Sequence, residues 1–443
     1  MSGSVTKEQA RERRPRRDSQ RRSRRSLGAR ERRLLLVLGV PTLAMAFSAT
    51  IVSTYLPVVA RRSTSSTLVI GLIILGEGLM AVVVPPLAGA WSDRFREHGG
   101  SRLTFVLAGV PVSFASMLAL AFVRSPAALA VLVAVFFAGN FLSYEPYRAL
   151  YPDLLANEVS GRAQASQAVS RGLGTVLSLA GGGVLLAIWL GLPFTTAAVL
   201  QASSVAVLVA LLPRVSRRTR ERRKRPRRED LRIQPRITYG RLRRLLREDA
   251  KLRLYLLANA LWELSLGALK TFVVLYVTVG LGHSLASASL IIGAVAIVII
   301  LGALASGLLG DRLGRIRTMR IGLWAYGLAL IVPIVTRSTL PLLIAVPLIA
   351  FGGGLTMTLP YAILMPLMPD GDHGAMTGFY SLSRGLGVML GPVLAGAAVQ
   401  LGGGAFSSTH GYAAIWIVTS ASILLSIPVL GRLARSIRRE NPA

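Results

Sequence analysis

The pentapeptide SRGLG stands at Ser170–Gly174 and returns at Ser383–Gly387, 213 residues later. Two shorter matches keep the same order along the chain at nearly the same spacing. A repeat of this kind predicts a chain built from two related halves, because it recurs at a fixed period. The shorter matches pair Pro146-Tyr147 with Pro360-Tyr361, and Asp93-Arg94 with Asp311-Arg312.

The stretches on either side of each repeat are almost free of charge. The 443 residues are 52% hydrophobic and 16% charged, with a mean hydropathy of +0.56, which is more apolar than a soluble domain. A helix needs about 20 mostly apolar residues to cross roughly 30 Å of hydrocarbon. Twelve stretches are predicted to do so: Leu34–Val59, Leu68–Trp91, Leu103–Val123, Leu129–Tyr144, Leu173–Leu190, Phe194–Leu212, Leu252–Val279, Ser284–Leu309, Ile321–Thr336, Leu340–Leu364, Ala375–Leu401 and Tyr412–Leu430.

Repeat and spans together predict an all-α membrane protein with twelve transmembrane helices in two pseudo-symmetric six-helix bundles. In such an arrangement the substrate site lies between the halves, near the middle of the bilayer. The predicted segments are a basic cytoplasmic tail (1–33), a first bundle (34–212), a basic cytoplasmic linker (213–251), a second bundle (252–431) and a cytoplasmic tail (432–443).

The basic residues predict how the chain is oriented. With the N-terminus inside, 44 of the 51 Lys and Arg residues fall in cytoplasmic segments, as the positive-inside rule requires. The outside loops hold only Arg61, Arg62, Arg124 and Arg337. We therefore expect a multi-pass protein of the inner (plasma) membrane with both termini in the cytoplasm.

The net charge of +31 allows two interpretations. Runs such as Arg222–Arg228 resemble tails that bind nucleic-acid phosphates. The preferred interpretation is that they fix topology and contact anionic lipid headgroups, since each basic residue near the surface contributes about 1 kcal/mol there. We accordingly expect a lipid bilayer and a small-molecule substrate as partners, no nucleic acid, and a monomer.

Other classes of protein are disfavoured by missing residues. The chain has no cysteine and four scattered histidines, so no metal site is expected. No phosphate-binding loop or nucleophile–base pair is present. We expect neither an enzyme nor an ATP-driven pump, and no cofactor beyond a coupling ion, H+ or Na+.

The sequence at the end of the eighth span, Gly307–Arg315, reads GLLGDRLGR. It resembles the loop motif of the major facilitator superfamily, and Gly89–Arg94 is its first-half counterpart. The segments Pro146–Leu150 and Gly161–Ala163 are similar to those of two sugar-transporting branches, the glycoside-pentoside-hexuronide:cation symporters and the sucrose/proton carriers. The resemblance covers roughly Leu34 to Arg432 and implies the major facilitator fold with transport by alternating access.

The loop motif places Asp93 and Asp311 at cytoplasmic helix ends. A carboxylate there would face the N-terminal end of a helix in the other half or pair with an arginine, and so latch the outward-facing state. The expected partners are Arg148, Arg171 and Arg384, although these would alternatively extend toward lipid headgroups. The predicted cytoplasmic gate and loop motif comprise Gly89, Asp93, Arg94, Glu145, Arg148, Arg171, Gly307, Asp311, Arg312, Gly314, Arg315 and Arg384.

Ionisable residues inside spans are functional candidates because their insertion is costly. Glu77 lies about ten residues into the second span, roughly 15 Å deep. Burial disfavours a charged carboxylate, so Glu77 would take up and release a proton as water access alternates. The alternative is a permanently protonated residue that bonds a neighbouring helix.

Asn259, Glu263 and Lys270 fall on one stripe of the seventh span, which is expected to face the central cavity. Glu263 and Lys270 are about 10.5 Å apart along the helix, too far for an ion pair. Each should therefore have another partner, such as substrate, a proton or a charge across the cavity. Alternatively, Lys270 extends outward. Asn140 and Tyr361 complete the candidate coupling and substrate residues, although single polar residues more often serve packing.

The sequence thus predicts a secondary active transporter of a small solute, coupled to H+ or another cation. A sugar or glycoside in symport is the first expectation. A proton-coupled exporter of lipophilic compounds is the second, because one fold serves both. A non-transporting sensor or lipid-handling protein on the same scaffold is the third.

Overall fold

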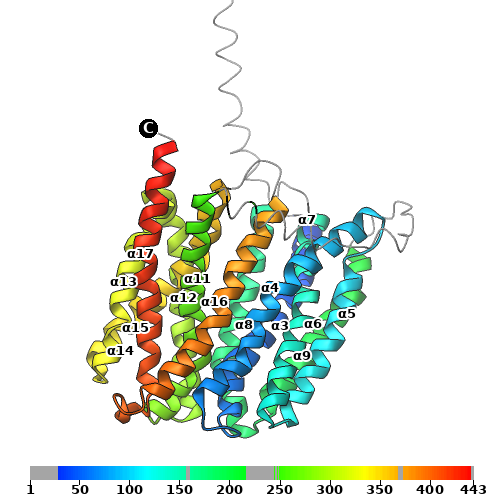
Figure 1. Cartoon of the computed structure of the whole chain (residues 1–443). Helices are drawn as coiled ribbons and strands as arrows, with labels where there is room; N and C mark the ends of the chain where they lie inside the picture. Colours follow the sequence, from blue (N-terminus) through cyan, green and yellow to red (C-terminus); the bar gives the residue numbers. More distant parts are fainter. Residues whose placement is uncertain are drawn as a thin grey trace, which may run out of the picture.

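The computed structural model describes residues 28–155, 160–215, 249–367 and 373–440, together with Arg244 and Arg247. Twelve helices in these ranges are long and apolar enough to cross a membrane, and they stand side by side as one bundle (Figure 1). The predicted fold class is therefore confirmed. Most of the predicted tail 1–33 and linker 213–251 lies outside the described residues.

Six long helices form the first half: α3 (Ala29–Ala60), α4 (Thr67–Glu97), α5 (Leu103–Phe122), α6 (Pro126–Arg148), α8 (Ser160–Ile188) and α9 (Leu192–Val215), with the short α7 (Leu150–Leu154) between α6 and α8. The second half contains α11 (Ala250–Leu275) with η3 (Tyr276–Gly280), α12 (Leu285–Leu313), α13 (Arg315–Ala329) with α14 (Val332–Val335), α15 (Thr339–Leu364) with η4 (Met365–Leu367), α16 (His373–Leu401), and η5 (Ser407–Thr409) and η6 (Tyr412–Ala414) before α17 (Ile415–Glu440).

Each predicted span coincides with a helix, but the ends differ. Helix α4 runs to Glu97 instead of ending at Trp91, so its last turns continue past the apolar stretch that defined the span. The predicted ninth span is divided into α13 and α14, with Pro333 near the start of α14, since proline has no backbone N–H to donate. Hydropathy thus located the spans but not the polar extensions of the helices.

Local sequence explains where several helices begin. The Ser66 hydroxyl accepts from the backbone N–H of Val69 at the start of α4, and the Asp249 carboxylate accepts from the N–H groups of Lys251 and Leu252 at the start of α11. Such caps satisfy donors that have no partner inside the helix. Between α12 and α13 the chain turns at Gly314, whose φ is +86°, a conformation that side chains bearing a Cβ rarely adopt.

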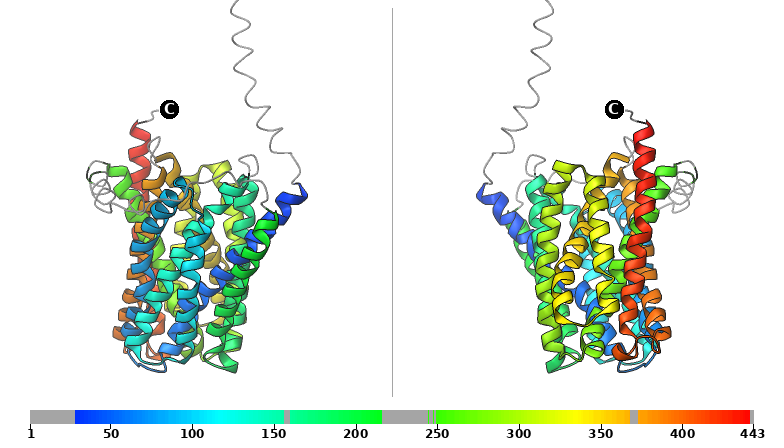
Figure 2. Two further views of the ribbon diagram at one scale, coloured as in Figure 1. Left: turned by 90° about the vertical axis from the view of Figure 1, so that its right-hand side faces the viewer. Right: turned by 90° about the vertical axis from the view of Figure 1, so that its left-hand side faces the viewer.

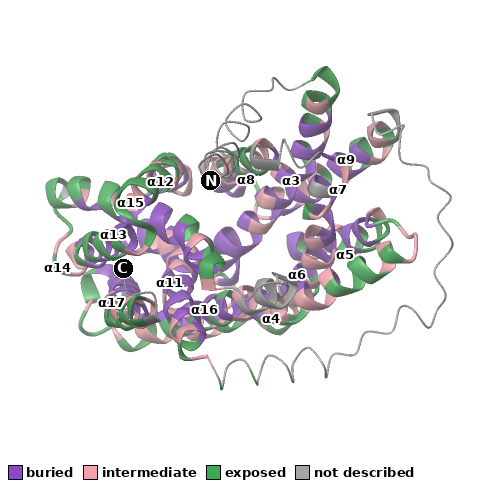
Figure 3. Ribbon diagram, turned by 90° about the horizontal axis from the view of Figure 1, so that it is seen from above, coloured by how far each residue is buried: buried purple, intermediate pink, exposed green. Residues whose placement is uncertain are grey.

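The two halves meet most extensively along two helix pairs. Helix α4 packs on α16, and α8 packs on α12, so each pair joins one helix of the first half to one of the second. Seen along the bundle axis, α4 with α16 and α8 with α12 lie at opposite ends of the line between the halves (Figure 3). Helix α3 also touches α11 across the halves, so a relative movement of the halves must slide or part this contact as well as the two seams.

At the α4–α16 seam the helices touch from the start of α4 to its middle. The Ser66 hydroxyl donates to Gln400 Oε1 at 2.7 Å, and the Thr67 hydroxyl donates to the carbonyl of Gly396 at 2.8 Å. Further along, a Cβ added to Gly78 would lie 2.4 Å from the Cα of Met389, so only glycine permits this approach. The seam is thus closed at the end of the bundle where α4 begins.

The α8–α12 seam is closed at the same end. The hydroxyls of Tyr55 and Ser289 lie 2.6 Å apart, which links α3 in the first half to α12 in the second. Ser289 Oγ also accepts from the backbone N–H of Gly183 in α8 at 2.7 Å. Both seams therefore hold the halves together on one side of the bundle.

The described chain starts and ends on the opposite side. Helix α3 begins and α17 ends at the face that also carries α7 and the C-terminal ends of α4 and α12 (Figures 1 and 2). Since the contacts between halves described above lie toward the other face, the structure is closed there. With the predicted orientation of the termini, this is an inward-facing conformation.

Candidate transport site

The central feature of the bundle is an ion pair between its halves. Lys270 Nζ in α11 donates to Glu77 Oε1 in α4 at 2.7 Å, the distance of a charge-assisted hydrogen bond. Glu77 is 7% exposed, and the Lys270 side chain is about one-third exposed. The structure thus gives Lys270 a partner across the halves, one of the options predicted, and directs its ammonium to Glu77 rather than outward.

A third helix completes the site around Glu77. The Ser53 hydroxyl in α3 donates to Glu77 Oε2 at 2.6 Å, and its oxygen also lies 2.8 Å from the carbonyl oxygen of Ala49. Both carboxylate oxygens of Glu77 are therefore bonded, one by Ser53 of the first half and the other by Lys270 of the second half. Sequence reasoning missed Ser53, because a serine four residues from a small residue is an ordinary feature of a packed membrane helix.

A second, looser pair lies on the same stripe of α11. Glu263 Oε1 is 3.7 Å from Arg384 Nε in α16, beyond hydrogen-bond distance. Glu263 is 9% exposed, while the Arg384 side chain is 51% exposed. Arg384 also lies within electrostatic range of Glu77 and Tyr144 in the first half, so its exposed side chain lies where the two halves face each other; we call this region the crevice.

Aromatic and basic side chains from both halves line this crevice. The Tyr361 and Tyr380 rings form an edge-to-face pair with centroids 5.6 Å apart, and the Arg148 guanidinium stands 5.7 Å from the Tyr144 ring centroid. Arg148 lies within electrostatic range of Arg384, and Tyr380 within range of Arg171. We call these six residues the crevice cluster: Tyr144, Arg148, Arg171, Tyr361, Tyr380 and Arg384.

Two predicted cavity residues are buried instead in helix contacts. Asn259 has no exposed surface, and its amide donates to the Ser383 hydroxyl in α16 at 2.8 Å. Asn140 is 4% exposed, and its carbonyl oxygen finds no hydrogen-bond partner within the described residues. Asn259 therefore fastens α11 to α16, whereas the stripe residues Glu263 and Lys270 carry the charge contacts.

The first-half gate residues form a network within their own half. Arg102 is 7% exposed; it lies 2.6 Å from Asp93 and 2.9 Å from Asp153, and donates to the Ser92 hydroxyl at 2.9 Å. Arg96 binds the other oxygen of Asp153 at 2.7 Å. Asp93 is thus paired with Arg102, and not with Arg148, Arg171 or Arg384, in this conformation.

The second-half motif is more open. Asp311 and Arg312 are exposed, and Asp311 forms no ion pair within the part of the chain that the structure describes. Arg315 donates to the carbonyl of Ala362 in α15 at 2.8 Å, which ties α13 to α15. Gly89 and Gly307 have open space where a side chain would project.

The remaining predicted gate residues include Glu145 and Arg94, and the contacts described for both lie within the first half. Glu145 lies 3.6 Å from Arg148, one turn along α6, so it offsets that charge locally. Arg94 accepts through its backbone carbonyl from the backbone N–H of His98 at 3.2 Å, at the end of α4. Only Arg148, Arg171 and Arg384 among the predicted gate residues belong to the crevice cluster.

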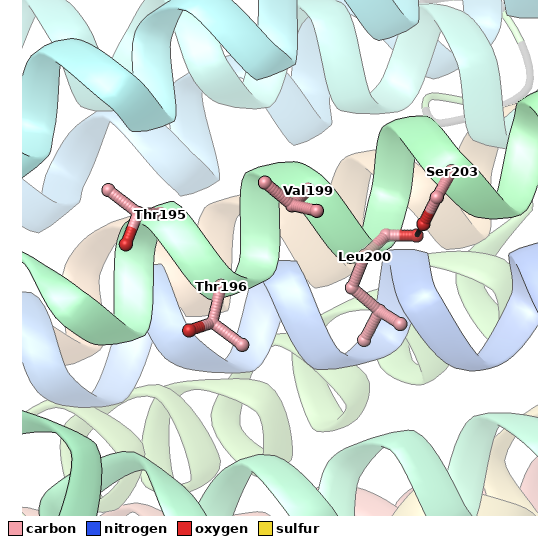
Figure 4. A pocket seen from close by; sticks show the side chains of 5 residues that line it. All are labelled: Thr195, Thr196, Val199, Leu200 and Ser203. Atoms are coloured by element: carbon pink, nitrogen blue, oxygen red, sulfur yellow. Dashed lines mark hydrogen bonds between the residues drawn. The ribbon is translucent and has the colours of Figure 1, made fainter.

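A groove on the surface of α9 lies apart from the residues described above. It measures about 430 Å³ and is lined by Thr195, Thr196, Val199, Leu200 and Ser203 (Figure 4). All five belong to one face of α9, and Val199 is 59% exposed. With no residue of the second half and no charge in its lining, this groove is not the transport site. Across the described residues, no group of three or more His, Cys, Asp or Glu side chains is placed to hold a metal ion.

Comparisons with known proteins agree with this architecture. The solved structure of a bacterial homologue of the human lysosomal transporter Spinster, inward-facing and unoccupied, matches with a TM-score of 0.75 at 14% identity, over 94% of this chain and 100% of that one. The nucleoside transporter NupG matches with a TM-score of 0.69 at 13% identity, over 90% and 98%. The human organic anion transporter MFSD10 (TETRAN) matches with a TM-score of 0.62 at 19% identity, over 91% and 100%.

By sequence, no curated protein matches the chain. The family profile of the Major Facilitator Superfamily matches it twice, over residues 38–305 and 255–443. These matches cover most of the chain and both predicted bundles. This chain is a member of the Major Facilitator Superfamily.

Proposed function

We propose that the chain is a secondary active transporter that moves a small solute across the inner membrane by alternating access, with a proton as the coupling ion. The observation that carries this proposal is the Glu77–Lys270 pair, because it joins the halves at mid-depth where they must separate. Both termini would lie in the cytoplasm, as the distribution of basic residues predicts.

The pair links proton occupancy to conformation. In the inward-facing state Lys270 and Ser53 occupy both oxygens of Glu77, which favours the carboxylate. When the outer ends of the halves part, Lys270 leaves with the second half, and an unpaired buried carboxylate is costly. Glu77 then takes a proton from outside. On return, the Lys270 ammonium displaces that proton toward the cytoplasmic side.

The second pair supports the same cycle from within the crevice. Glu263 and Arg384 are 3.7 Å apart, so a substrate group can enter between them with little loss of bonding. Glu263 and Lys270 lie on the same stripe of α11. When a substrate displaces Arg384 from Glu263, the resulting shift of α11 therefore also moves Lys270, which contacts Glu77. Substrate and proton sites therefore share one helix.

Substrate type is a separate step of the proposal. A sugar or glycoside rests on the similarity of Pro146–Leu150 and the loop motif to the sugar-carrying branches. The structural neighbours are named for different cargoes, including nucleosides and organic anions. Shared fold does not select among these, so the crevice itself must supply the argument.

Proteoliposomes with an internal pH-sensitive dye test the proposal. Candidate solutes are added outside, and solute-dependent acidification of the lumen is expected for symport. Glu77→Gln should abolish proton-driven accumulation while keeping solute exchange across the membrane, because glutamine imitates the protonated carboxyl but cannot release a proton. Glu97→Gln, which removes an exposed charge from the end of the same helix, is the matched control.

Three outcomes would contradict the proposal. Proton-driven accumulation that persists in Glu77→Gln would remove Glu77 from coupling. Solute-dependent alkalinisation would indicate exchange of protons against exported solute. Absence of flux for every solute class would favour a non-transporting protein on this scaffold. Replacing the pH gradient by a Na+ gradient distinguishes the two coupling ions.

A further inference from the structure

Three guanidinium groups from both halves surround the crevice. Arg148 comes from α6 and Arg171 from α8, in the first half, while Arg384 comes from α16, in the second. All three are exposed, although α6, α8 and α16 each span the membrane. Arg171 and Arg384 lie inside their membrane-spanning helices, whereas Arg148 is the last residue of α6. Basic side chains within spans usually face the bundle interior or a water-filled cavity and mark a ligand or ion pathway.

Among the described residues, carboxylates only partly offset this charge. Two of them form ion pairs with the cluster: Glu145, 3.6 Å from Arg148, and Glu263, 3.7 Å from Arg384. Both distances exceed the 2.7–2.9 Å typical of N–H donors bonded to carboxylates. Within the described residues, three guanidiniums against these two paired carboxylates leave one excess positive charge, and the guanidinium donors of Arg148 and Arg384 are free of short bonds to these acids.

Arg148 and Arg384 belong to opposite halves, and their like charges repel. Each lies within electrostatic range of the other, and like charges across a crevice favour its open form. A ligand with a negative group between them would satisfy both sets of donors, since guanidinium binds carboxylate through two parallel hydrogen bonds. Such a ligand would draw the cytoplasmic ends of the halves together.

The rest of the lining is aromatic. Tyr361 is 43% exposed and forms an edge-to-face pair with Tyr380, while Tyr144 stands beside Arg148. These rings offer flat apolar surface with a hydroxyl at the edge, which suits an aromatic body more than a neutral polyol. The lining thus combines one excess positive charge with three rings.

We propose that the transported solute is an aromatic or similarly flat organic carboxylate with a single negative charge, bound between Arg148 and Arg384 with its ring against Tyr361 and Tyr380. This inference rests on the proposed transport function and names its substrate class. A single charge is expected because it matches the net charge of the cluster. On binding, the carboxylate competes with Glu263 for Arg384.

Binding is measured on the purified full-length protein in detergent, without any gradient, by calorimetry and thermal shift. The probes are benzoate and 2-naphthoate, with benzamide as the neutral analogue, benzylamine as the cation, phenyl phosphate as the dianion and glucose as the polyol. We expect the carboxylates to stabilise the protein in a concentration-dependent way, 2-naphthoate more than benzoate, and the amide, amine and glucose to have no effect.

Variants locate the site. Arg384→Gln and Arg148→Gln should each weaken carboxylate binding about tenfold or more, because each removes charged donors. The carboxylate affinity of Arg148→Lys should fall between those of the parent and Arg148→Gln, since lysine keeps the charge but lacks the forked guanidinium. Arg320→Gln, which removes an exposed arginine from the start of α13, is the matched control and should bind like the parent. Unfolding midpoints without ligand show whether each variant is folded.

The outcomes separate this inference from the transport proposal. Carboxylate binding that is unchanged in both Arg→Gln variants, stabilisation by glucose or benzylamine alone, or tighter binding of phenyl phosphate than of benzoate would each overturn it. Proton-coupled flux of a neutral sugar would overturn it while leaving the transport proposal intact. Carboxylate binding through Arg148 and Arg384 without any flux would support the site and remove the transport function.

Discussion

The Lys270 ammonium lies 2.7 Å from a carboxylate oxygen of Glu77, although the two residues are 193 positions apart and belong to opposite halves of the chain. This pair is formed while the outer ends of the halves are in contact. It therefore helps to stabilise this arrangement of the halves, and it would break in any conformation in which α4 and α11 move apart.

Removing one member of the pair should cost more than removing both. Lys270→Met leaves Glu77 buried and bonded only by Ser53, and we expect a loss of about 2 kcal/mol; this is less than the loss for a fully enclosed pair, because Lys270 is partly exposed. The double variant Glu77→Gln with Lys270→Met should recover most of that loss. Unfolding midpoints of the parent, Glu77→Gln, Lys270→Met and the double variant in detergent check this. Equal destabilisation in Lys270→Met and the double variant would contradict it.

The first-half network should depend on the shape of Arg102 and not only on its charge. Arg102→Gln leaves Asp153 and Ser92 without their buried donor, and we expect a loss of about 3 kcal/mol. Arg102→Lys should restore little of this stability, because the compact ammonium of lysine lacks the forked guanidinium that bonds all three acceptors. Arg96→Gln removes a more exposed contact and should cost less than about 1 kcal/mol. Thermal unfolding of the three variants gives the order.

The outer seam can be locked, because the chain contains no cysteine of its own. Ser66→Cys and Gln400→Cys place thiols where a hydroxyl and an amide oxygen now meet at 2.7 Å. Joining them by oxidation or a short bismaleimide should stop transport, and reduction should restore it in the oxidised sample. Each single cysteine variant under the same treatment is the control; full activity of the joined protein would show that this seam does not open.

Tyr55 should set how firmly the outer side is closed. Tyr55→Phe removes the hydroxyl that meets Ser289 and that donates to the carbonyl of Leu179, a loss of about 1 kcal/mol or roughly fivefold in the closed-to-open ratio. In the cysteine background just described, the joining of positions 66 and 400 should then be slower. An unchanged rate would mean that the Tyr55–Ser289 contact does not hold the seam.

The sequence predicted the helices well because spans depend on local composition. All twelve spans and the division into halves follow from apolar length and an internal repeat, which need no knowledge of tertiary packing. Helix ends were less accurate: the polar extension of α4 to Glu97 carries no hydropathy signal, and the break at Pro333 lay inside an apolar run.

Partners could not be predicted in the same way, because they depend on how each helix is rotated and which helix lies beside it. The stripe of α11 was expected to carry Asn259, Glu263 and Lys270 toward one cavity, yet Asn259 turns to Ser383 and is sealed. Arg102 is the partner of Asp93, whereas Arg148, Arg171 and Arg384 were the expected partners. The spacing of residues along one helix predicts which of them share a face, but it does not predict which residues of other helices they contact.

The two loop motifs are fastened differently, and this has a consequence for how the bundle deforms. The end of α4 is tied through Asp93, Arg102 and Asp153 to α5 and α7, whereas Asp311 at the end of α12 is exposed. The first half should therefore behave as the stiffer body, and most bending during turnover should occur in the second. Amide deuterium uptake should accordingly be faster at the end of α12 than at the end of α4.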